Sequence, residues 1–473
     1  MNSIVQKIYW KAPYFVKSWM ASINTWRRGH ERYGLAYQQI LSEIDEHDKW
    51  STEQFIEYQN KQLCFLIQHI ATKVPYYRKV FSEAGVDPKG INGLNDLQRL
   101  PILEKEVIRA NPASLVNKEL DKNRLIIGYT SGTTGTPLKL YRDIRLYSAA
   151  SAYFDARCHS VASVRRRINR SVSIGGHLVT AQQRNKPPFW VYNSRWKQLY
   201  MSSYHLSPRY LSYYFDKLLK FKAEYIEGYP TSIFAVARYI LDNKLETVPF
   251  KACFTTGETL FAHQRVAIEE AFGCKMYNQY GCAEVAVFAA ECKHGCLHLS
   301  PEIGIVEVVD DKDQPVSDGQ KGQLICTSLI NYVQPFIRYR IGDIGSLSTD
   351  LCSCGSPLPV LDTIEGMREG NVLVTSDGRQ IGEAALSLLF YGVKGVTESQ
   401  IIQDDYTRFR VCLVPGENYE AADGQEVMAN LAQRLGQVEI HLELRDKIER
   451  TVGGKSNLVI CNLPNKSQLK VCK

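Results

Sequence analysis

Residues 129–139 read Tyr-Thr-Ser-Gly-Thr-Thr-Gly-Thr-Pro-Leu-Lys, and this stretch is the most informative in the chain. Its glycines permit a tight turn, and its hydroxyls, backbone N–H groups and one lysine can bind phosphate oxygens. The apolar residues 125–127 before it predict a short strand. A Walker A loop is excluded because the Gly-Lys-Ser/Thr ending is missing. The alternative is a Ser/Thr-rich surface turn. The candidate phosphate-binding residues are Thr130, Ser131, Gly132, Thr133, Thr134, Gly135 and Lys139.

Composition limits the classes of protein to consider. The 473 residues are 44% hydrophobic and 23% charged, which favours a globular protein with one large and one smaller domain. No run of about 18 apolar residues predicts a membrane span, and no signal-peptide core is evident. Thirteen cysteines, an odd number, indicate free thiols or a metal site in a reducing cytoplasm. The net charge of +7, without a basic run rich in aromatics, argues against nucleic-acid binding.

The N-terminal stretch is basic and aromatic, with Trp10, Phe15, Trp19 and Trp26 among several lysines and arginines. One interpretation is an amphipathic helix that makes peripheral contact with the inner face of an acidic membrane. The other is a helix whose aromatic face packs on the body of the protein. The interruption at Pro13 favours packing.

The middle of the chain alternates between strand and helix patterns. Residues 172–176, 225–230 and 251–257 each resemble a strand that runs into a turn, and Thr231 is expected to cap a helix over 232–242. This alternation predicts α/β layers with a site at the strand ends. The candidate pocket residues at those ends are Gly176, His177, Gly228, Tyr229 and Gly257.

Four further motifs follow the loop in order. They are Thr255-Thr-Gly-Glu-Thr-Leu260, Tyr277-Asn-Gln-Tyr-Gly-Cys-Ala-Glu284, Tyr339-Arg-Ile-Gly-Asp343 and Arg450-Thr-Val-Gly-Gly-Lys-Ser456. With the loop, they resemble the adenylate-forming enzymes. Within these enzymes the chain is similar to the phenylacetate–CoA ligase family, and in particular to its CapK-like branch, which is associated with polysaccharide biosynthesis.

The resemblance implies a role for each motif. Gly257 and Glu258 line the adenine pocket, Tyr280 and Gly281 hold adenine, and Asp343 accepts hydrogen bonds from the ribose hydroxyls. Glu284 helps to hold Mg²⁺, as suits a carboxylate and a hard cation. Lys455 swings into the site and contacts the α-phosphate, so Lys455, Glu284 and Thr130 are the catalytic candidates. His177, Gly228 and Tyr229 are the acid-binding candidates.

The hinge motif departs from the family pattern. Relatives carry Gly-Arg followed by an acidic residue, whereas residues 364–370 read Ile-Glu-Gly-Met-Arg-Glu-Gly, so Met367 stands where Arg is usual. Arg368 is the candidate substitute, reaching the ribose or phosphate.

A Cys/His-rich pair of loops predicts a structural zinc site. Residues 292–298 read Cys-Lys-His-Gly-Cys-Leu-His, and Cys352 and Cys354 follow later. Thiolates and imidazole are suitable zinc ligands. Four protein ligands fill the coordination sphere of the ion and leave no position for a catalytic water or a substrate. By analogy with the family, Cys292, His298, Cys352 and Cys354 are the expected ligands, with His294 and Cys296 as competitors in the first loop.

These features predict an α/β protein with a large, multi-layer adenylate-forming domain and a small, mobile α+β C-terminal domain. The expected divisions are a helical arm (1–55), a large ATP- and acid-binding domain (56–363) and a lid (364–473). The expected activity is ATP-dependent formation of an acyl-adenylate from a carboxylic acid, followed by transfer to CoA. Transfer to an amine of a sugar or amino acid and a non-catalytic zinc-stabilised scaffold are the alternatives. The oligomeric state is left open.

Overall fold

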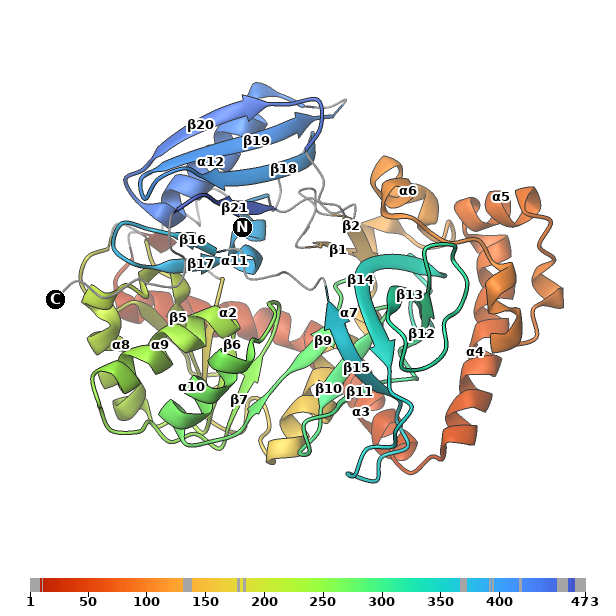
Figure 1. The fold of residues 1–473 in the computed structure, drawn as a ribbon, viewed down its shortest axis with the longest axis horizontal. Coiled ribbons are helices and arrows are strands. Elements are labelled where there is room, and N and C mark those ends of the chain that lie inside the picture. The colour runs from red at the N-terminus through yellow and green to blue at the C-terminus, as the bar shows by residue number, and fades with distance from the viewer. Residues whose placement is uncertain are drawn as a thin grey trace.

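The computed structural model describes residues 9–10, 12–130, 138–176, 179–181, 184–365, 372–390, 393, 395–416, 419–448 and 458–463. Two sheets side by side, with helices around them, form the larger part of the molecule, and a smaller α+β unit lies above them (Figure 1). The predicted α/β architecture with a separate C-terminal unit is confirmed.

The first sheet has six strands and supports the predicted strand-end loops. All neighbouring strands are parallel except the edge strand β4, which runs antiparallel to β5. Because parallel strands share a direction, the ends of β3, β6 and β7 meet at one edge. The order is β4 (Trp190–Asn193), β5 (Gln198–Ser202), β3 (Ser171–Gly175), β6 (Tyr225–Gly228), β7 (Ala252–Thr255) and β8 (Met276–Tyr277).

Helices cover both faces of this sheet, as the alternation predicted. One apolar cluster joins a face of the sheet to α8 (Pro208–Phe221), α9 (Pro230–Asp242) and α10 (Ala262–Phe272). A second cluster joins the other face to α3 (Leu35–His47) and α7 (Ile144–Tyr153). Ile226 of β6 belongs to the first cluster and its neighbour Tyr225 to the second, as expected when successive side chains alternate across a sheet.

The start of α9 corrects one expectation. The helix begins at Pro230, with Tyr229 as its N-cap, so Thr231 does not cap it. Proline suits the first helical position because the N–H group that it lacks would have no partner within the helix there. The Thr231 hydroxyl instead donates to Oε2 of Glu258 at 2.7 Å, which ties α9 to the end of β7.

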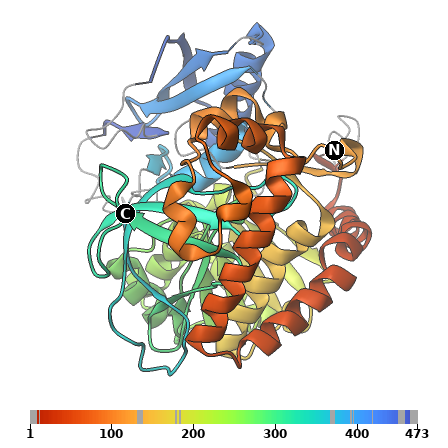
Figure 2. The ribbon, with the colours of Figure 1, turned by 90° about the vertical axis from the view of Figure 1, so that its right-hand side faces the viewer.

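The second sheet is antiparallel and has seven strands. Its order is β12 (Gly304–Val309), β13 (Gly322–Ser328), β14 (Tyr339–Leu347), β15 (Val360–Glu365), β11 (Leu297–Leu299), β10 (Phe288–Glu291) and β9 (Gln279–Gly281). The hairpin of β1 (Ile126–Tyr129) and β2 (Lys139–Arg142) forms a separate two-stranded sheet. The flanking helices are α4 (Thr52–Lys73), α5 (Pro75–Glu83) and α6 (Lys105–Ala110), and Figure 2 shows α4 crossing the front of this sheet.

The C-terminal unit has two sheets of its own. A hairpin of β16 (Val372–Val374) and β17 (Gln380–Gly382) is followed by α11 (Glu383–Ser387). The hydrophobic pattern of the sequence predicts strands over 408–414 and 438–444 and an amphipathic helix over 425–435, and all three are present. The four-stranded sheet has the order β20 (Glu439–Leu444), β19 (Arg408–Pro415), β18 (Val396–Gln403) and β21 (Val459–Cys461), with α12 (Ala421–Leu435) between β19 and β20 in the chain.

Tyr204, in the segment between β5 and α8, fastens the C-terminal unit to the large domain. Its ring is buried in the apolar cluster of that unit. Arg434 Nε donates to the Tyr204 hydroxyl at 3.1 Å, and Arg379 Nη1 donates to the Tyr204 carbonyl at 2.6 Å. Arg379 also donates to the carbonyls of Arg434 and Leu435, at 3.1 and 3.0 Å.

The N-terminal helices α2 (Tyr14–Arg32) and α3 lie at the rim of the molecule (Figure 2). The expectation that the aromatic face of the first helix packs on the protein is wrong for two residues, since Phe15 is 71% and Trp19 64% exposed. Polar Ser18, Ser22 and Thr25 contact β4 and the turn after it instead. Among the described residues, no helix is both long enough and apolar enough to cross a membrane.

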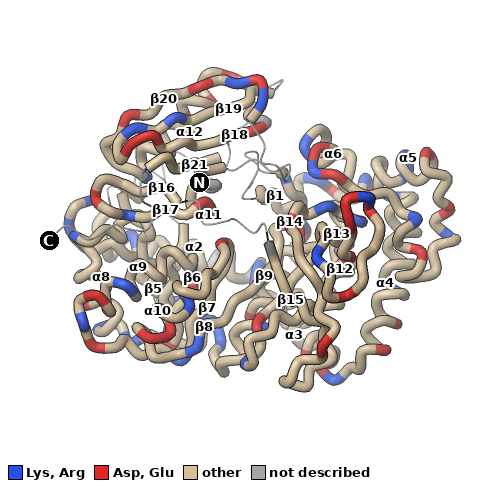
Figure 3. The backbone as a smooth tube through the Cα atoms, viewed as in Figure 1, with Lys and Arg blue, Asp and Glu red and all other residues tan. Residues whose placement is uncertain are grey.

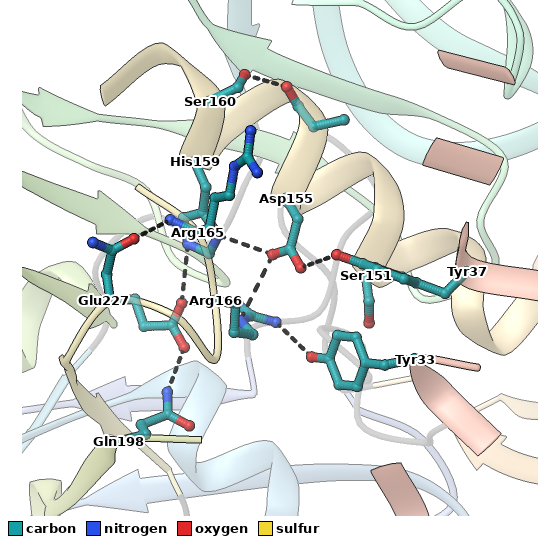
Figure 4. Close-up of polar contacts among 12 residues, drawn as sticks. Tyr33, Tyr37, Ser151, Asp155, His159, Ser160, Arg165, Arg166, Gln198 and Glu227 are labelled. Carbon is teal, nitrogen blue, oxygen red and sulfur yellow. Dashed lines mark hydrogen bonds and ion pairs between the residues drawn. The ribbon is translucent and has the colours of Figure 1, made fainter. Parts of the chain in front are cut away.

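A buried ionic cluster joins these helices to the six-stranded sheet (Figure 4). Arg166 Nη2 lies 2.8 Å from Oε2 of Glu227 on β6. Asp155, in the π-helical segment Phe154–His159, accepts from the Tyr37 hydroxyl at 2.8 Å and lies 2.8 Å from His159 Nδ1. Burial by itself raises the pKa of Glu227, but Arg166 and His159 outweigh it and lower that pKa to about 2.

Glu227→Gln should lower the free energy of unfolding at pH 7 by about 3 kcal/mol, because the folded protein stabilises the ionised carboxylate and holds its pKa at about 2, below the ordinary value of 4.5. A carboxyl with a lowered pKa stabilises the fold above its unfolded pKa and loses that effect as pH falls. The difference from wild type should therefore shrink between about pH 4.5 and 2. Urea unfolding across this range measures it. The control, Asp242→Asn, breaks an exposed ion pair with Arg238 and should cost under about 1 kcal/mol; equal losses in both variants would contradict the role of Glu227.

Arg379→Met should destabilise the protein by about 3 kcal/mol, because the carbonyls of Tyr204, Arg434 and Leu435 lose their donor while remaining buried. Arg408→Met is the matched control, since Arg408 is exposed and pairs only at the surface with Asp405. Hydrogen exchange should show faster opening of α12 in the first variant. Unchanged exchange there would mean that the contact around Tyr204 does not hold the C-terminal unit.

Candidate functional site

The predicted phosphate loop is the tip of the β1–β2 hairpin. Tyr129 pairs with Lys139, and the backbone N–H of Thr130 donates to the carbonyl of Leu138 at 3.0 Å. The Thr130 hydroxyl oxygen accepts from the Leu138 N–H at 2.8 Å, so two hydrogen bonds between Thr130 and Leu138 close the base of the loop. The loop thus leads into a strand, unlike a Walker A loop, which leads into a helix. Five predicted residues, Ser131, Gly132, Thr133, Thr134 and Gly135, lie outside the described residues.

Lys139 lies just after this loop, on β2. Its Nζ is 5.0 Å from the centre of the Tyr141 ring. A hydrogen bond with Tyr141 raises the pKa of Lys139, so the amine carries a positive charge at neutral pH. Arg142, the last residue of β2, donates through Nη2 to the carbonyl of Ala283. The hairpin is therefore attached to the 277–284 motif.

The 277–284 and 339–343 motifs exchange two hydrogen bonds. The Tyr280 hydroxyl donates to Oδ2 of Asp343 at 2.8 Å, and the Tyr339 hydroxyl donates to Oε1 of Glu284 at 2.8 Å. Both tyrosines and Glu284 are buried. Burial, and then the neighbouring carboxylates, raise the pKa of Tyr280 and Tyr339, which keeps both hydroxyls protonated as donors. The two predicted carboxylates are thus held in fixed positions.

Further polar contacts join these motifs to β7. Gln279 Nε2 donates to the Thr256 hydroxyl, and the Thr255 hydroxyl donates to Oδ1 of Asn278 at 3.2 Å. Gly257, which follows Thr256, has a φ of +77°, a conformation that favours glycine. Gly281 follows at the end of β9, where an added Cβ would lie 3.3 Å from the Phe288 ring.

Glu258 lies where the large domain meets the C-terminal unit. Its Oε2 accepts from both the hydroxyl and the N–H of Thr231, at 2.7 and 3.3 Å. A Cβ added to Gly382 of β17 would lie only 1.9 Å from Glu258 Oε1, so β17 passes directly over this carboxylate. In this conformation Glu258 connects α9 to the C-terminal unit.

The expected acid-binding residues lie at the end of β6. A Cβ on Gly228 would come within 2.0 Å of the Ile174 carbonyl, so close packing of β6 on β3 requires glycine there. Tyr229 follows as the N-cap of α9, and its ring packs partly against the apolar cluster of the C-terminal unit. The Gly176 carbonyl accepts from the Tyr204 hydroxyl at 2.8 Å. His177, Arg368 and Lys455 lie outside the described residues.

The four expected zinc ligands come together at one end of the seven-stranded sheet. The ligand atoms of Cys292, His298, Cys352 and Cys354 all lie within 4.8 Å of one another, while Cys296 and His294 are not in this group. The first loop joins β10 to β11 and the second joins β14 to β15, and β11 pairs with β15, which brings the loops together.

Local hydrogen bonds prepare these side chains for a metal. The N–H of His294 lies 3.3 Å from Cys292 Sγ, and the N–H of Cys354 lies 3.4 Å from Cys352 Sγ. Burial raises the pKa of Cys292, but the N–H groups around its sulfur outweigh burial and lower it. His298 Nδ1 is 3.0 Å from the Leu358 carbonyl, which leaves Nε2 facing Cys354 Sγ at 3.4 Å. This is the arrangement expected of a metal-ligating histidine.

Sequence reasoning missed the partners of the two carboxylates. In the sequence, Tyr339 is only the first residue of a motif. Arg142 and Gln279, which attach the 277–284 motif to its neighbours, have no local signal either. A buried tyrosine next to a predicted carboxylate motif is a usable signal, because its hydroxyl needs a partner. Which carboxylate it meets depends on how the sheet curls, and this is not visible in the sequence.

Comparisons with known proteins agree with this geometry. Residues 373–462 match the family model described as the CapK C-terminal domain. The chain is 30% identical over 467 residues to Protein CapK of Staphylococcus aureus, covering 96% of this chain and 99% of that protein. Phenylacetate-coenzyme A ligase of Thermus thermophilus is 26% identical over 309 residues, covering 63% of this chain and 66% of the relative.

The fold is also found among solved structures. The crystal structure of 2-hydroxyisobutyryl-CoA ligase in the postadenylation state, in complex with R3-HIB-AMP, has a TM-score of 0.56 and 20% identity, covering 88% of this chain and 92% of that one. The same enzyme with 2-HIB-AMP and CoA in the thioesterification state also gives a TM-score of 0.56, at 21% identity. At this identity the likeness concerns the fold. Together with the full-length similarity to Protein CapK, it means that the chain belongs to the CapK-like branch of the phenylacetate–CoA ligase family of adenylate-forming enzymes.

Proposed function

We propose that the protein uses ATP to convert a carboxylic acid into an acyl-adenylate and then transfers the acyl group to the thiol of CoA. The observation that carries this proposal is a pair of carboxylates, the buried Glu284 and the half-buried Asp343, which Tyr339 and Tyr280 hold in place. Arg142 attaches the β1–β2 hairpin to the motif that contains Glu284. Family membership adds support, since phenylacetate-coenzyme A ligases are among the similar proteins.

The reaction has two balanced steps. An oxygen of the substrate carboxylate attacks the α-phosphorus of ATP, and pyrophosphate leaves. The thiol then attacks the acyl carbon of the mixed anhydride, and AMP leaves. Preorganised donors and cations that face the phosphates stabilise the charge that develops in the first step. In this proposal the loop 130–135 and Lys139 supply those groups.

The remaining roles follow the predicted residues. A carboxylate has enough acceptor positions for two neighbouring hydroxyls, so Asp343 would accept from both hydroxyls of the ribose. Tyr280, Gly281, Gly257 and Glu258 border the adenine. Mg²⁺, when bound, would neutralise phosphate charge, and Glu284 would hold it. Glu284 fits this role because Tyr339 fixes its carboxylate while leaving oxygen lone pairs for a cation. Arg368 and Lys455 would enter from the C-terminal unit.

The acid would bind at the ends of β3, β6 and β7, between His177, Gly228 and Tyr229. The acceptor in the second step is the less defined part. An amine of a sugar or amino acid, in polysaccharide biosynthesis, is the alternative acceptor that the resemblance to the CapK-like branch implies. Both alternatives share the first step, so that step is tested first.

The test is acid-dependent exchange of labelled pyrophosphate into ATP, measured with a panel of carboxylic acids. Exchange with one acid supports the proposal, and the preferred acid identifies the substrate class. Single-turnover transfer to CoA, or to amines, then separates the two acceptors. Absence of exchange with every acid, in folded protein with Mg²⁺ present, would favour a non-catalytic scaffold.

Lys455→Ala should slow pyrophosphate exchange by at least about 100-fold while changing ATP affinity little, because a charge used in the transition state affects rate more than ground-state binding. Transfer from a supplied acyl-adenylate should continue, since that step would use another orientation of the C-terminal unit. Lys447→Ala, a nearby change outside the motif, is the control. Unimpaired exchange in Lys455→Ala would remove this residue from the mechanism.

The four-ligand group, we further propose, holds one structural Zn²⁺. Three thiolates and one imidazole suit zinc in tetrahedral geometry, and the set leaves no open position for catalysis. The ion would clamp the β10–β11 loop onto the β14–β15 loop. These loops belong to the same sheet as Tyr280 and Asp343, so loss of the metal should disturb the site indirectly.

Purified protein should therefore contain about one Zn²⁺ per chain, the stoichiometry of a single closed site. Cys352→Ser should lose the metal and lower the unfolding temperature, whereas Cys296→Ser, from the same pair of loops but outside the ligand group, should keep both. Atomic emission and thermal unfolding measure these quantities. Metal loss in Cys296→Ser with retention in Cys352→Ser would show that the ligand set is wrong.

A further inference from the structure

Helix α2 carries an exposed row of large apolar side chains. Phe15 is 71%, Trp19 64% and Ile23 43% exposed. Their spacing of four residues places them on one side of the helix, one above the other. Single exposed apolar residues are ordinary on protein surfaces, but a row with two aromatics is typical of an interaction surface.

A neighbouring side of α2 is already fixed to the protein. Ser18 Oγ accepts from the Tyr192 N–H at 3.3 Å, and Thr25 Oγ1 accepts from Asn193 Nδ2 at 2.8 Å. Ser22 Oγ lies 3.1 Å from Ser194 Oγ, in the turn after β4. These contacts hold the helix against the edge strand β4, so the apolar row is presented outward by a helix whose position is set.

The two sequence segments that form α2 and β4 are rich in lysine and arginine. Residues 160–222 contain twelve lysines and arginines but a single acidic residue, Asp216, and residues 1–34 contain six against one. The whole chain has a net charge of only +7, so the remaining residues are net acidic. Positive charge is therefore concentrated in residues 1–34, which include α2, and in residues 160–222, which include β3, β4, β5 and α8.

Several of these cations lie on the elements that adjoin α2. Arg195 and Lys197 are exposed in the β4–β5 turn, directly after Ser194, which contacts α2. On the other side of β4, Lys217 of α8 lies 5.8 Å from the centre of the Trp190 ring. Blue positions along α8 and the loops near β5 are visible at the lower left of Figure 3. The further exposed basic residues of the segment 160–222 are Arg165, Arg170, Lys186, Arg209, Lys220 and Lys222.

We propose that α2 and the basic surface around β4 dock on an anionic lipid bilayer. Aromatic side chains on such a helix enter the boundary between headgroups and acyl chains, while lysines and arginines beside them bind the anionic headgroups. This assignment goes beyond acid activation and does not depend on it.

The charge pattern favours lipid over other occupants. A second copy of the chain in a two-fold dimer would bring two cationic surfaces together, which repel. A nucleic acid would bind the cations. Single strands, however, bind in grooves where bases stack on aromatic side chains, and a convex helix with Phe15, Trp19 and the aliphatic Ile23 in a row does not form such a groove. A bilayer uses both the apolar row and the cations.

The test is flotation of the full-length protein with vesicles of phosphatidylcholine alone, and of phosphatidylcholine mixed with phosphatidylglycerol. Binding should require the anionic lipid and weaken as the salt concentration rises. Combining Phe15→Ser with Trp19→Ser should weaken binding at least about tenfold, because two interfacial aromatics are lost. Lys186→Glu with Lys197→Glu should weaken it by about tenfold or more.

The matched control lies on α4, on the other side of the molecule in Figure 1. Phe65 there is 59% exposed and Lys61 is exposed, so Phe65→Ser with Lys61→Glu makes the same kinds of change and should leave binding unaltered. Thermal unfolding of all variants should match wild type, because every changed side chain is at the surface. Equal binding to neutral and mixed vesicles, or equal effects of control and test variants, would overturn the proposal.

Discussion

Two tyrosine–carboxylate hydrogen bonds, from Tyr280 to Asp343 and from Tyr339 to Glu284, hold the centre of this protein together. Glu284 is buried and Asp343 half-buried, and a carboxylate removed from water is costly without donors. Each tyrosine supplies a donor to its carboxylate. The bonds are reciprocal: each of the two motifs gives one tyrosine and one carboxylate. Since β9 and β14 are separated by three strands in the sheet order, these contacts also require the sheet to curl back on itself.

The other parts of the large domain are arranged around this constraint. Arg142 attaches the β1–β2 hairpin to the 277–284 motif, and contacts of Gln279 and Asn278 attach the same motif to the end of β7. The parallel strands β3, β6 and β7 then place their terminal loops at the same edge. Tyr204 and Glu258, at that edge, meet the C-terminal unit through Arg379, Arg434 and Gly382. Any rotation of that unit must therefore break these contacts.

Much of this organisation could be predicted from local patterns. Strands over 172–176, 225–230 and 251–257 were predictable because short apolar runs end in glycine-rich turns, and the strands and helix of the C-terminal unit followed from periodicity. Finer features depended on tertiary contacts. Pro230 begins α9, so Thr231 is not its cap, and the Thr231 hydroxyl donates to Glu258 instead. Phe15 and Trp19 face outward because Ser18 and Thr25 occupy the contact with β4. The tyrosine partners of Glu284 and Asp343 lie 55 and 63 residues away and have no local signature.

The central claim is that Asp343 and Glu284 are held in place to receive a nucleotide. The most direct measurement is a crystal structure of the protein with a non-hydrolysable analogue of an acyl-adenylate. The account predicts both ribose hydroxyl oxygens within about 3 Å of the Asp343 carboxylate, with the Tyr280 hydroxyl still bonded to it. It also predicts the acyl group between the ends of β3 and β6, next to Gly228. An analogue bound elsewhere, with the Tyr280–Asp343 and Tyr339–Glu284 pairs closed and untouched, would contradict the account.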